Sequence, residues 1–181
     1  WAGENGIAAY GVIMYVNFAF LSIFLGYAMG YAPIVSYHYG AGNTRELKSL
    51  LRKSLTLNIS GGVIMTALGI LLSGPISVSF VGYDETLCAI THRGFMLFAG
   101  CFMFAGVNIM SSGFFTALNN GPVSAAISFL RTLVFQVSAV LLLPLLWELD
   151  GIWISAVVAD VLALTVTTGC LIALRKRYGY A

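Results

Sequence analysis

The amino-acid sequence predicts an all-α membrane protein with about five transmembrane helices. Hydrophobic residues make up 59% of the 181 residues and charged residues only 9%, whereas soluble domains carry about 25% charged residues. The apolar residues form long continuous runs, each able to cross a hydrocarbon core of about 30 Å as a helix. Transmembrane β-strands are excluded, because they would appear as alternating segments of about ten residues.

Charged residues divide the chain into five apolar runs, and we expect one transmembrane helix in each. A helix satisfies its own backbone hydrogen bonds, so a continuous apolar segment in lipid must be helical. The expected spans cover approximately residues 7–37, 55–81, 95–118, 123–147 and 152–174. Short connections, "NNGP" and "ELDG", join the last three spans into consecutive antiparallel hairpins.

The first span carries a proline and two glycines near its second end. Pro33 removes a backbone hydrogen bond and should kink or break the helix near Gly30 and Tyr31. Gly26 and Gly30 predict a narrow face that a neighbouring helix can approach closely. Packing alone explains such residues, yet transporters also place discontinuous helices beside substrate. Gly30 and Pro33 are therefore candidate kink or gating residues.

A basic segment follows the first span at once. Gly40 and Gly42 should end that helix, and Asn43 or Thr44 should cap the start of the next one. The segment carries Arg45, Lys48, Arg52 and Lys53. We expect an amphipathic helix at the cytoplasmic surface that leads into the second span.

The connection between the second and third spans is longer than the others. Gly74 and Pro75 predict the end of the second span. Asp84 and Thr86 predict the cap of a short amphipathic or extended segment that precedes the third span.

Lysine and arginine residues set the expected orientation. Four lie between the first and second spans and three follow the fifth span, whereas the other connections carry only Arg93 or none. The positive-inside rule then places the first connection and the C-terminus in the cytoplasm. An odd number of spans fits an outer N-terminal end, so we expect a multi-pass protein of the cell membrane.

Asp160 is the only acidic residue within an expected span. It lies roughly 14 Å from the outer surface, and carboxylates inside membranes are functional by default. Binding of a proton or Na⁺ is one interpretation, and hydrogen bonding to Ser155 or Thr165 is the structural alternative. Arg131 is the obvious partner, but helical rise separates the two residues by roughly 10 Å in depth. Snorkelling of Arg131 toward the cytoplasmic headgroups is therefore favoured over an ion pair.

Polar residues also share one face of the third span. Asn108 is followed by Ser111 and Ser112 at helical spacing. Together with Asp160, Asn108 and Ser111 are candidates for lining a cavity or for ion coupling. Hydrogen bonding between helices is the alternative, and it is common for Asn and Ser in membranes.

Several function classes lack support in the sequence. No phosphate-binding glycine loop and no nucleophile–base motif is present, so we expect neither an enzyme nor catalytic residues. The two histidines and three cysteines lack metal-ligand spacing, and we expect no metal site and no cofactor. A net charge of +2 does not indicate a nucleic-acid partner.

Three stretches resemble the multidrug and toxic compound extrusion (MATE) family. They are "GYAPIVSYHYGAGNTRELKSL", "SSGFFTALNNGPVSAAISFLRTLVFQ" and "LLPLLWELDGIWISAVVADVLAL", and together they extend over nearly the whole chain. The resemblance implies a twelve-helix transporter of two six-helix lobes. Residues 1–181 would be a C-lobe fragment with helices eight to twelve, completed by an N-lobe from the same polypeptide. The start at Trp1 rather than methionine agrees with such a piece.

The resemblance implies export of drugs and organic cations in exchange for Na⁺ or H⁺. The expected partners are a small amphiphilic or cationic substrate, the lipid bilayer and the N-lobe. Some members carry a cation-binding aspartate in the third of these spans, where Asn108 could stand here. The absence of this carboxylate at Asn108 favours ion coupling mainly in the N-lobe.

Two alternatives stay open. The first keeps the fold and changes the cargo to a lipid-linked glycan or polysaccharide, as in flippases of the same superfamily. Such a cavity should contain more cationic residues than Arg131 alone. The second is a membrane-anchoring subunit that transports nothing itself.

Overall fold

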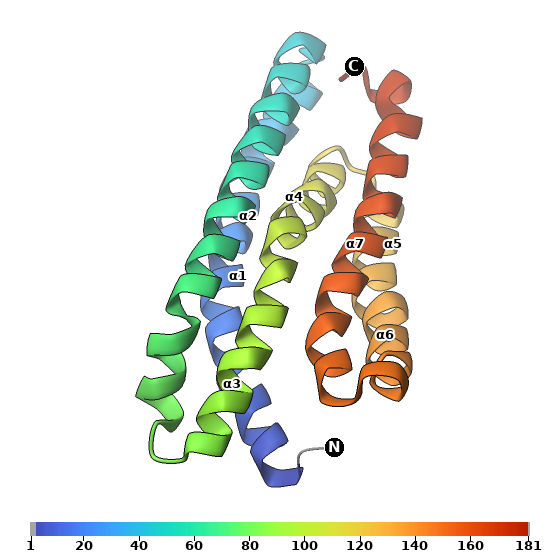
Figure 1. Cartoon of the computed structure of the whole chain (residues 1–181). Coiled ribbons are helices and arrows are strands. Elements are labelled where there is room, and N and C mark those ends of the chain that lie inside the picture. Colours follow the sequence, from blue (N-terminus) through green and yellow to red (C-terminus); the bar gives the residue numbers. More distant parts are fainter. Residues whose placement is uncertain (1–2, 181) are drawn as a thin grey trace.

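A computed structural model describes residues 3–180 as an antiparallel bundle of helices (Figure 1). Five helical segments are long and apolar enough to cross a membrane. They are Gly3–Gly40, Thr44–Val81, Glu85–Ala117, Gly121–Leu142 and Pro144–Tyr178. The predicted all-α membrane fold and the order of its five spans are confirmed, while several boundaries differ.

Helix α1 (Gly3–Gly40) runs through Pro33 without a break. Of the two predicted outcomes, a kink or a break, the break is therefore wrong. Proline removes one hydrogen bond of a long helix, and the many remaining bonds propagate the helix past it. Gly26 and Gly30 lie on an exposed face, where an added Cβ would meet nothing within 4 Å. The predicted close approach of another helix is therefore not made by residues 3–180.

Helix α2 (Thr44–Val81) joins the basic segment and the second span into one element. The predicted cap is confirmed, since Asn43 Oδ1 accepts a hydrogen bond of 3.1 Å from the Glu46 N–H. The predicted end at Gly74 and Pro75 is wrong, because the helix continues to Val81. Ser73, Ser77 and Val81 are buried along one face, and their packing carries the helix past the proline.

The third span consists of α3 (Glu85–Phe98), a short 3₁₀ turn η1 (Ala99–Cys101) and α4 (Phe102–Ala117). Asp84 caps α3 as predicted, with its Oδ1 accepting from the Leu87 N–H at 3.0 Å. The expected separate segment is instead the first part of the span. Gly106 provides the close approach here, since an added Cβ would lie 2.6 Å from the Phe24 ring.

The fourth span consists of α5 (Gly121–Phe129), a π-helical turn η2 (Leu130–Phe135) and α6 (Gln136–Leu142). The fifth is α7 (Pro144–Tyr178), which is interrupted by non-helical backbone at Trp147 and Glu148. The fourth span thus ends five residues before the expected Trp147. The regular part of the fifth begins after Glu148, three residues before the expected Ile152.

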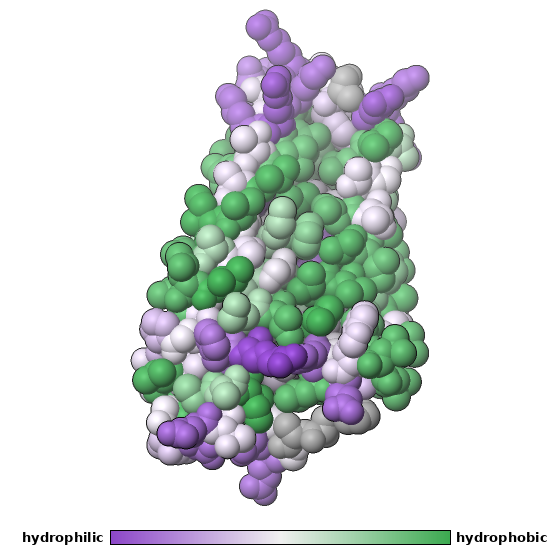
Figure 2. Space-filling model, in the orientation of Figure 1, coloured by the Kyte–Doolittle hydropathy of each residue, from purple (hydrophilic) through white to green (hydrophobic). Residues whose placement is uncertain are grey.

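The two basic segments lie at the same end of the bundle. Figure 1 shows the turn between α1 and α2 beside the C-terminus, and Figure 2 shows hydrophilic side chains at this end above a largely hydrophobic belt. Gly179 ends α7 with a left-handed backbone, and the Tyr180 hydroxyl donates to the Leu171 carbonyl at 2.9 Å. Burial raises the pKa of Tyr180 to about 12. This arrangement agrees with the expectation that both basic segments lie on the same side of the membrane.

Candidate functional site

Asp160 and Arg131 form an ion pair inside the bundle. Arg131 Nε donates to Asp160 Oδ1 at 2.5 Å, and Asp160 is 5% exposed. The expectation that Arg131 snorkels away from Asp160 is therefore wrong. The reason is the position of the reversal: Arg131 lies eleven residues before Leu142, and Asp160 eleven residues after Leu149. The two side chains thus lie at the same depth.

The arginine projects from the π-helical turn η2. The Gln136 N–H donates to the Arg131 carbonyl, five residues back instead of the four of an α-helix. One residue is thereby inserted into the turn, and such π-bulges are frequent at functional sites. The sequence "LRTLVF" carries no signal for this turn.

Asn108 connects the ion pair to α4. Its Nδ2 donates to the Asp160 carbonyl at 3.0 Å and to Asp160 Oδ1 at 3.4 Å, while its Oδ1 accepts from the Thr167 hydroxyl at 2.9 Å. All three residues are buried. Two of the predicted site residues, Asp160 and Asn108, are therefore in contact.

Ser111 does not join this group. Its buried Oγ has no hydrogen-bond partner among the residues that the structure describes. The structural alternatives for Asp160 also fail, because the hydroxyls of Ser155 and Thr165 donate to the carbonyls of Ile152 and Leu162 instead.

A cluster of hydroxyl groups lies beside the ion pair, where α4 meets α5. Ser112 Oγ lies 2.9 Å from both Ser124 Oγ and Ser128 Oγ, and Thr116 Oγ1 lies 2.7 Å from Ser124 Oγ. This cluster was not predicted from the sequence. Its signal is the spacing of four residues within each pair, from Ser112 to Thr116 and from Ser124 to Ser128, which places each pair on one helical face.

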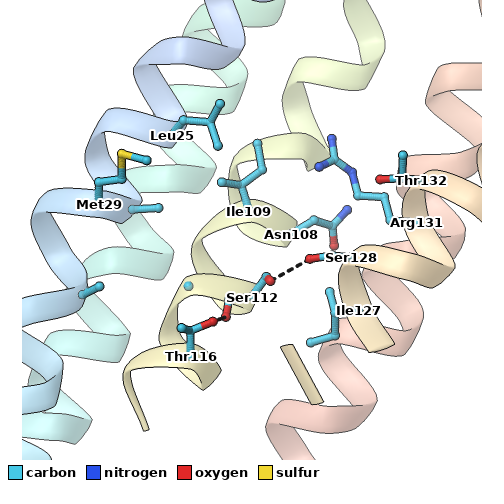
Figure 3. Close-up of a pocket in the computed structure, with 13 residues that line it drawn as sticks. Leu25, Met29, Asn108, Ile109, Ser112, Thr116, Ile127, Ser128, Arg131 and Thr132 are labelled. Carbon is cyan, nitrogen blue, oxygen red and sulfur yellow. Dashed lines mark hydrogen bonds between the residues drawn. The ribbon is translucent and has the colours of Figure 1, made fainter. Parts of the chain in front are cut away.

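Two cavities meet at Arg131. The first has a volume of about 360 Å³ and lies between α1, α4 and α5. The second has a volume of about 200 Å³, and Asp160, Asn17 and Gln136 are among its lining residues. Arg131 lines both. Figure 3 shows Leu25 and Met29 on one side of the first cavity and the polar residues of α4, α5 and η2 on the other. A wall of this kind can contact an amphiphilic molecule through both apolar groups and hydroxyls.

The candidate gating residues lie apart from this site. Gly30 and Pro33 are exposed on α1, whereas their neighbours Met29 and Ala32 line the first cavity. Among residues 3–180 no group of three or more His, Cys, Asp or Glu side chains could hold a metal ion.

Comparison with known proteins relates the chain to transporters. A family model described as MatE matches residues 1–142. The chain is 31% identical over 93 residues to a probable multidrug resistance protein NorM from Synechocystis sp., which covers 48% of this chain and 20% of that protein.

Solved structures share the fold of this chain at about 20% sequence identity. One is the outward-facing conformation of a multidrug resistance MATE family transporter, with a TM-score of 0.87 over 96% of this chain. An inward-facing conformation of such a transporter has a TM-score of 0.78 over 93% of this chain. A transporter of the MOP superfamily from Pyrococcus furiosus, described by a binding pocket of reverse polarity, has a TM-score of 0.86 over 98% of this chain. The matched part is 40%, 39% and 39% of those three chains, in that order.

Proposed function

The chain belongs to the MATE family, and on this premise we propose that it is part of a secondary active antiporter that exports drugs or organic cations in exchange for Na⁺ or H⁺. The similarity to a probable multidrug resistance protein and to multidrug resistance transporters supports this proposal. The chain spans about 40% of the solved transporters, so the activity is that of the larger protein.

The first cavity carries the substrate part of the proposal. Its apolar side includes Leu25, Met29 and Ile109, and its polar side includes Ser112 and Ser128. Its one charged lining residue among residues 3–180 is Arg131, whose charge is balanced by Asp160. A wall with apolar surface, hydroxyls and no uncompensated charge suits amphiphilic substrates, which adaptable apolar surfaces accommodate in different shapes.

Ion coupling is assigned mainly to residues outside this chain. A guanidinium in contact with Asp160 neutralises the charge that would attract Na⁺ or a proton, and Asn108 occupies the same carboxylate oxygen. Asp160 and Asn108 instead hold α4, η2 and α7 together while the two lobes of the transporter rock against each other. Ser111 stays a candidate ligand only in combination with groups from the N-lobe.

The exposed face of α1 is proposed to contact that N-lobe. Gly26, Gly30 and Pro33 are exposed on this face, and a Cβ added at either glycine would meet nothing within 4 Å. Small residues let a second helix approach closely, and proline permits bending at that contact. By the positive-inside rule, both basic segments are proposed to lie on the cytoplasmic side of the membrane.

Ethidium efflux from cells that express the full-length transporter tests the proposal. Asp160→Asn keeps an oxygen that can accept from Arg131 Nε, and it is compared with Asn108→Ala and the parent at matched membrane levels. We expect both variants to retain efflux. Loss of efflux with Asp160→Asn alone, in a variant that unfolds like the parent, would place ion coupling at Asp160. No efflux even from the parent would favour the flippase or the anchoring subunit.

A further inference from the structure

A basic groove runs along the first turns of α2. It is a shallow, open space between side chains of this one helix, which are cationic and hydroxyl side chains and one leucine. The lining residues are Arg45, Lys48, Ser49, Arg52, Lys53, Thr56, Leu57 and Ser60. Their spacing of three and four residues places most of them on one helical face.

This face is directed away from the bundle. The buried face of α2 contains Leu47, Leu51, Ser54 and Asn58, whereas the four cationic side chains are exposed. Neither of the two ion pairs in residues 3–180 involves a residue of the groove. The cationic groups are therefore free to bind an anion.

A second basic segment reinforces the positive charge at this end. Arg175, Lys176 and Arg177 form the last turn of α7. That turn reaches the start of α2, because a Cβ added at Gly179 would lie 2.8 Å from Thr44 Cγ2. Glu46 is the one acidic residue in the first turn of α2, so the charge of the combined surface is strongly positive.

The groove continues into the membrane as an apolar stripe. Ile59, Val63 and Ile70 follow Arg52 by seven, eleven and eighteen residues, which keeps them on the same face. All three are exposed. A hydrocarbon chain can lie along this stripe with its polar head at the cationic residues.

We propose that this surface binds one anionic phospholipid. Its phosphate lies between Arg45, Lys48 and Arg52, and its acyl chain follows Ile59, Val63 and Ile70. Arginine presents paired donors that match phosphate oxygens. Ser49 supplies a further hydroxyl, whereas Thr56 and Ser60 already donate to the backbone carbonyls of Arg52 and Leu57.

The apolar stripe distinguishes a lipid from a soluble phosphate. A free phosphate would gain nothing from exposed Ile59 and Val63, while a phospholipid satisfies the cationic and the apolar part of the surface together. Anionic lipids are also enriched beside juxtamembrane basic clusters. This inference does not depend on the proposed function.

Native mass spectrometry of the delipidated full-length transporter, titrated with phosphatidylglycerol and with phosphatidylcholine, tests the proposal. The first variant carries Arg45→Gln, Lys48→Gln and Arg52→Gln. The matched control carries Arg175→Gln, Lys176→Gln and Arg177→Gln, which removes the same charge at the same end but outside the groove. All six side chains are exposed, and a retained size-exclusion profile verifies folding.

We expect one phosphatidylglycerol to bind the parent more tightly than phosphatidylcholine. Each cation near an anionic lipid contributes about fivefold, so the groove variant should bind phosphatidylglycerol roughly 100-fold more weakly. The control should lose only a few-fold. Equal losses in both variants would show attraction to the charged end without a site, and unchanged binding in the groove variant or equal binding of both lipids would also overturn the proposal.

Discussion

Two arginine–aspartate ion pairs join α7 to its neighbours, and they differ in their surroundings. Arg131 and Asp160 meet inside the bundle, with side chains 22% and 7% exposed. Arg93 of α3 and Asp150 meet at the end opposite the basic segments, with side chains 71% and 29% exposed. The arginine Nε donates to the aspartate Oδ1 in both pairs, and in the exposed pair Arg93 Nη2 also donates to Asp150 Oδ2.

The difference shows that burial decides what an ion pair does for the molecule. Water can replace either partner of the exposed pair, so that pair contributes little to the stability of the fold. The Asp160 side chain is only 7% exposed, so water replaces its partner less readily and the buried carboxylate depends on Arg131. The buried pair therefore determines how η2 and α7 pack against each other. The exposed pair only links α3 to the first turns of α7.

Breaking one side of the buried pair should give the largest effect. Arg131→Ala leaves the Asp160 carboxylate buried without its cation, and we expect the free energy of unfolding to fall by about 3–5 kcal/mol. Chemical unfolding of the purified full-length transporter measures this change. The control is Arg93→Ala at the exposed pair, and similar losses for the two arginine variants would refute the comparison.

Removing the bridge from α4 to the buried pair should give an intermediate effect. Asn108→Leu leaves the Thr167 hydroxyl and the Asp160 carbonyl without their partner, which typically costs about 1–3 kcal/mol. Ser111→Ala is the matched control on the same helix, because it removes a buried hydroxyl that has no partner among residues 3–180. The same unfolding assay should show no loss for the control. A larger loss for Ser111→Ala would contradict the assigned hydrogen bonds.

Altering the exposed pair should give the smallest effect. Arg93→Gln removes a charge that water already hydrates, so we expect little change in unfolding. Any change should vanish at about 1 M salt, where the screening length falls to about 3 Å. The effect of Arg131→Ala should persist under the same salt. Loss of that persistence would mean that water reaches the buried pair.

Much of the fold could be predicted from the sequence, because lipid leaves helices as the solution for long apolar runs. The caps at Asn43 and Asp84 were also predictable, since each side chain accepts a hydrogen bond from the backbone N–H three residues later. Pro75 was misinterpreted because proline marks a helix end in loops, whereas packing of one face carried α2 past it. The helix caps thus follow from the local sequence, whereas the end of α2 depends on tertiary packing.

The site was less accessible to sequence reasoning. Asp160 and Asn108 were recognised as polar residues in apolar spans, but their contact depends on how two helices align. The pairing of Arg131 with Asp160 was missed, because depth was counted from Trp147 and Gly151 rather than from the observed reversal. A shift of a few residues at that turn, together with the π-helical turn, moved one side chain by several ångströms.

The most direct test of the account replaces both charges of the buried pair by apolar groups of similar size. Dye efflux is measured for the full-length transporter with Asp160→Leu alone and with Arg131→Met and Asp160→Leu together, at matched membrane levels. If the pair is structural and the coupling site lies elsewhere, the double variant should recover stability and export dye like the parent. A stable double variant that exports no dye would contradict the account, because the charges of the pair would then be needed for transport and not only for stability.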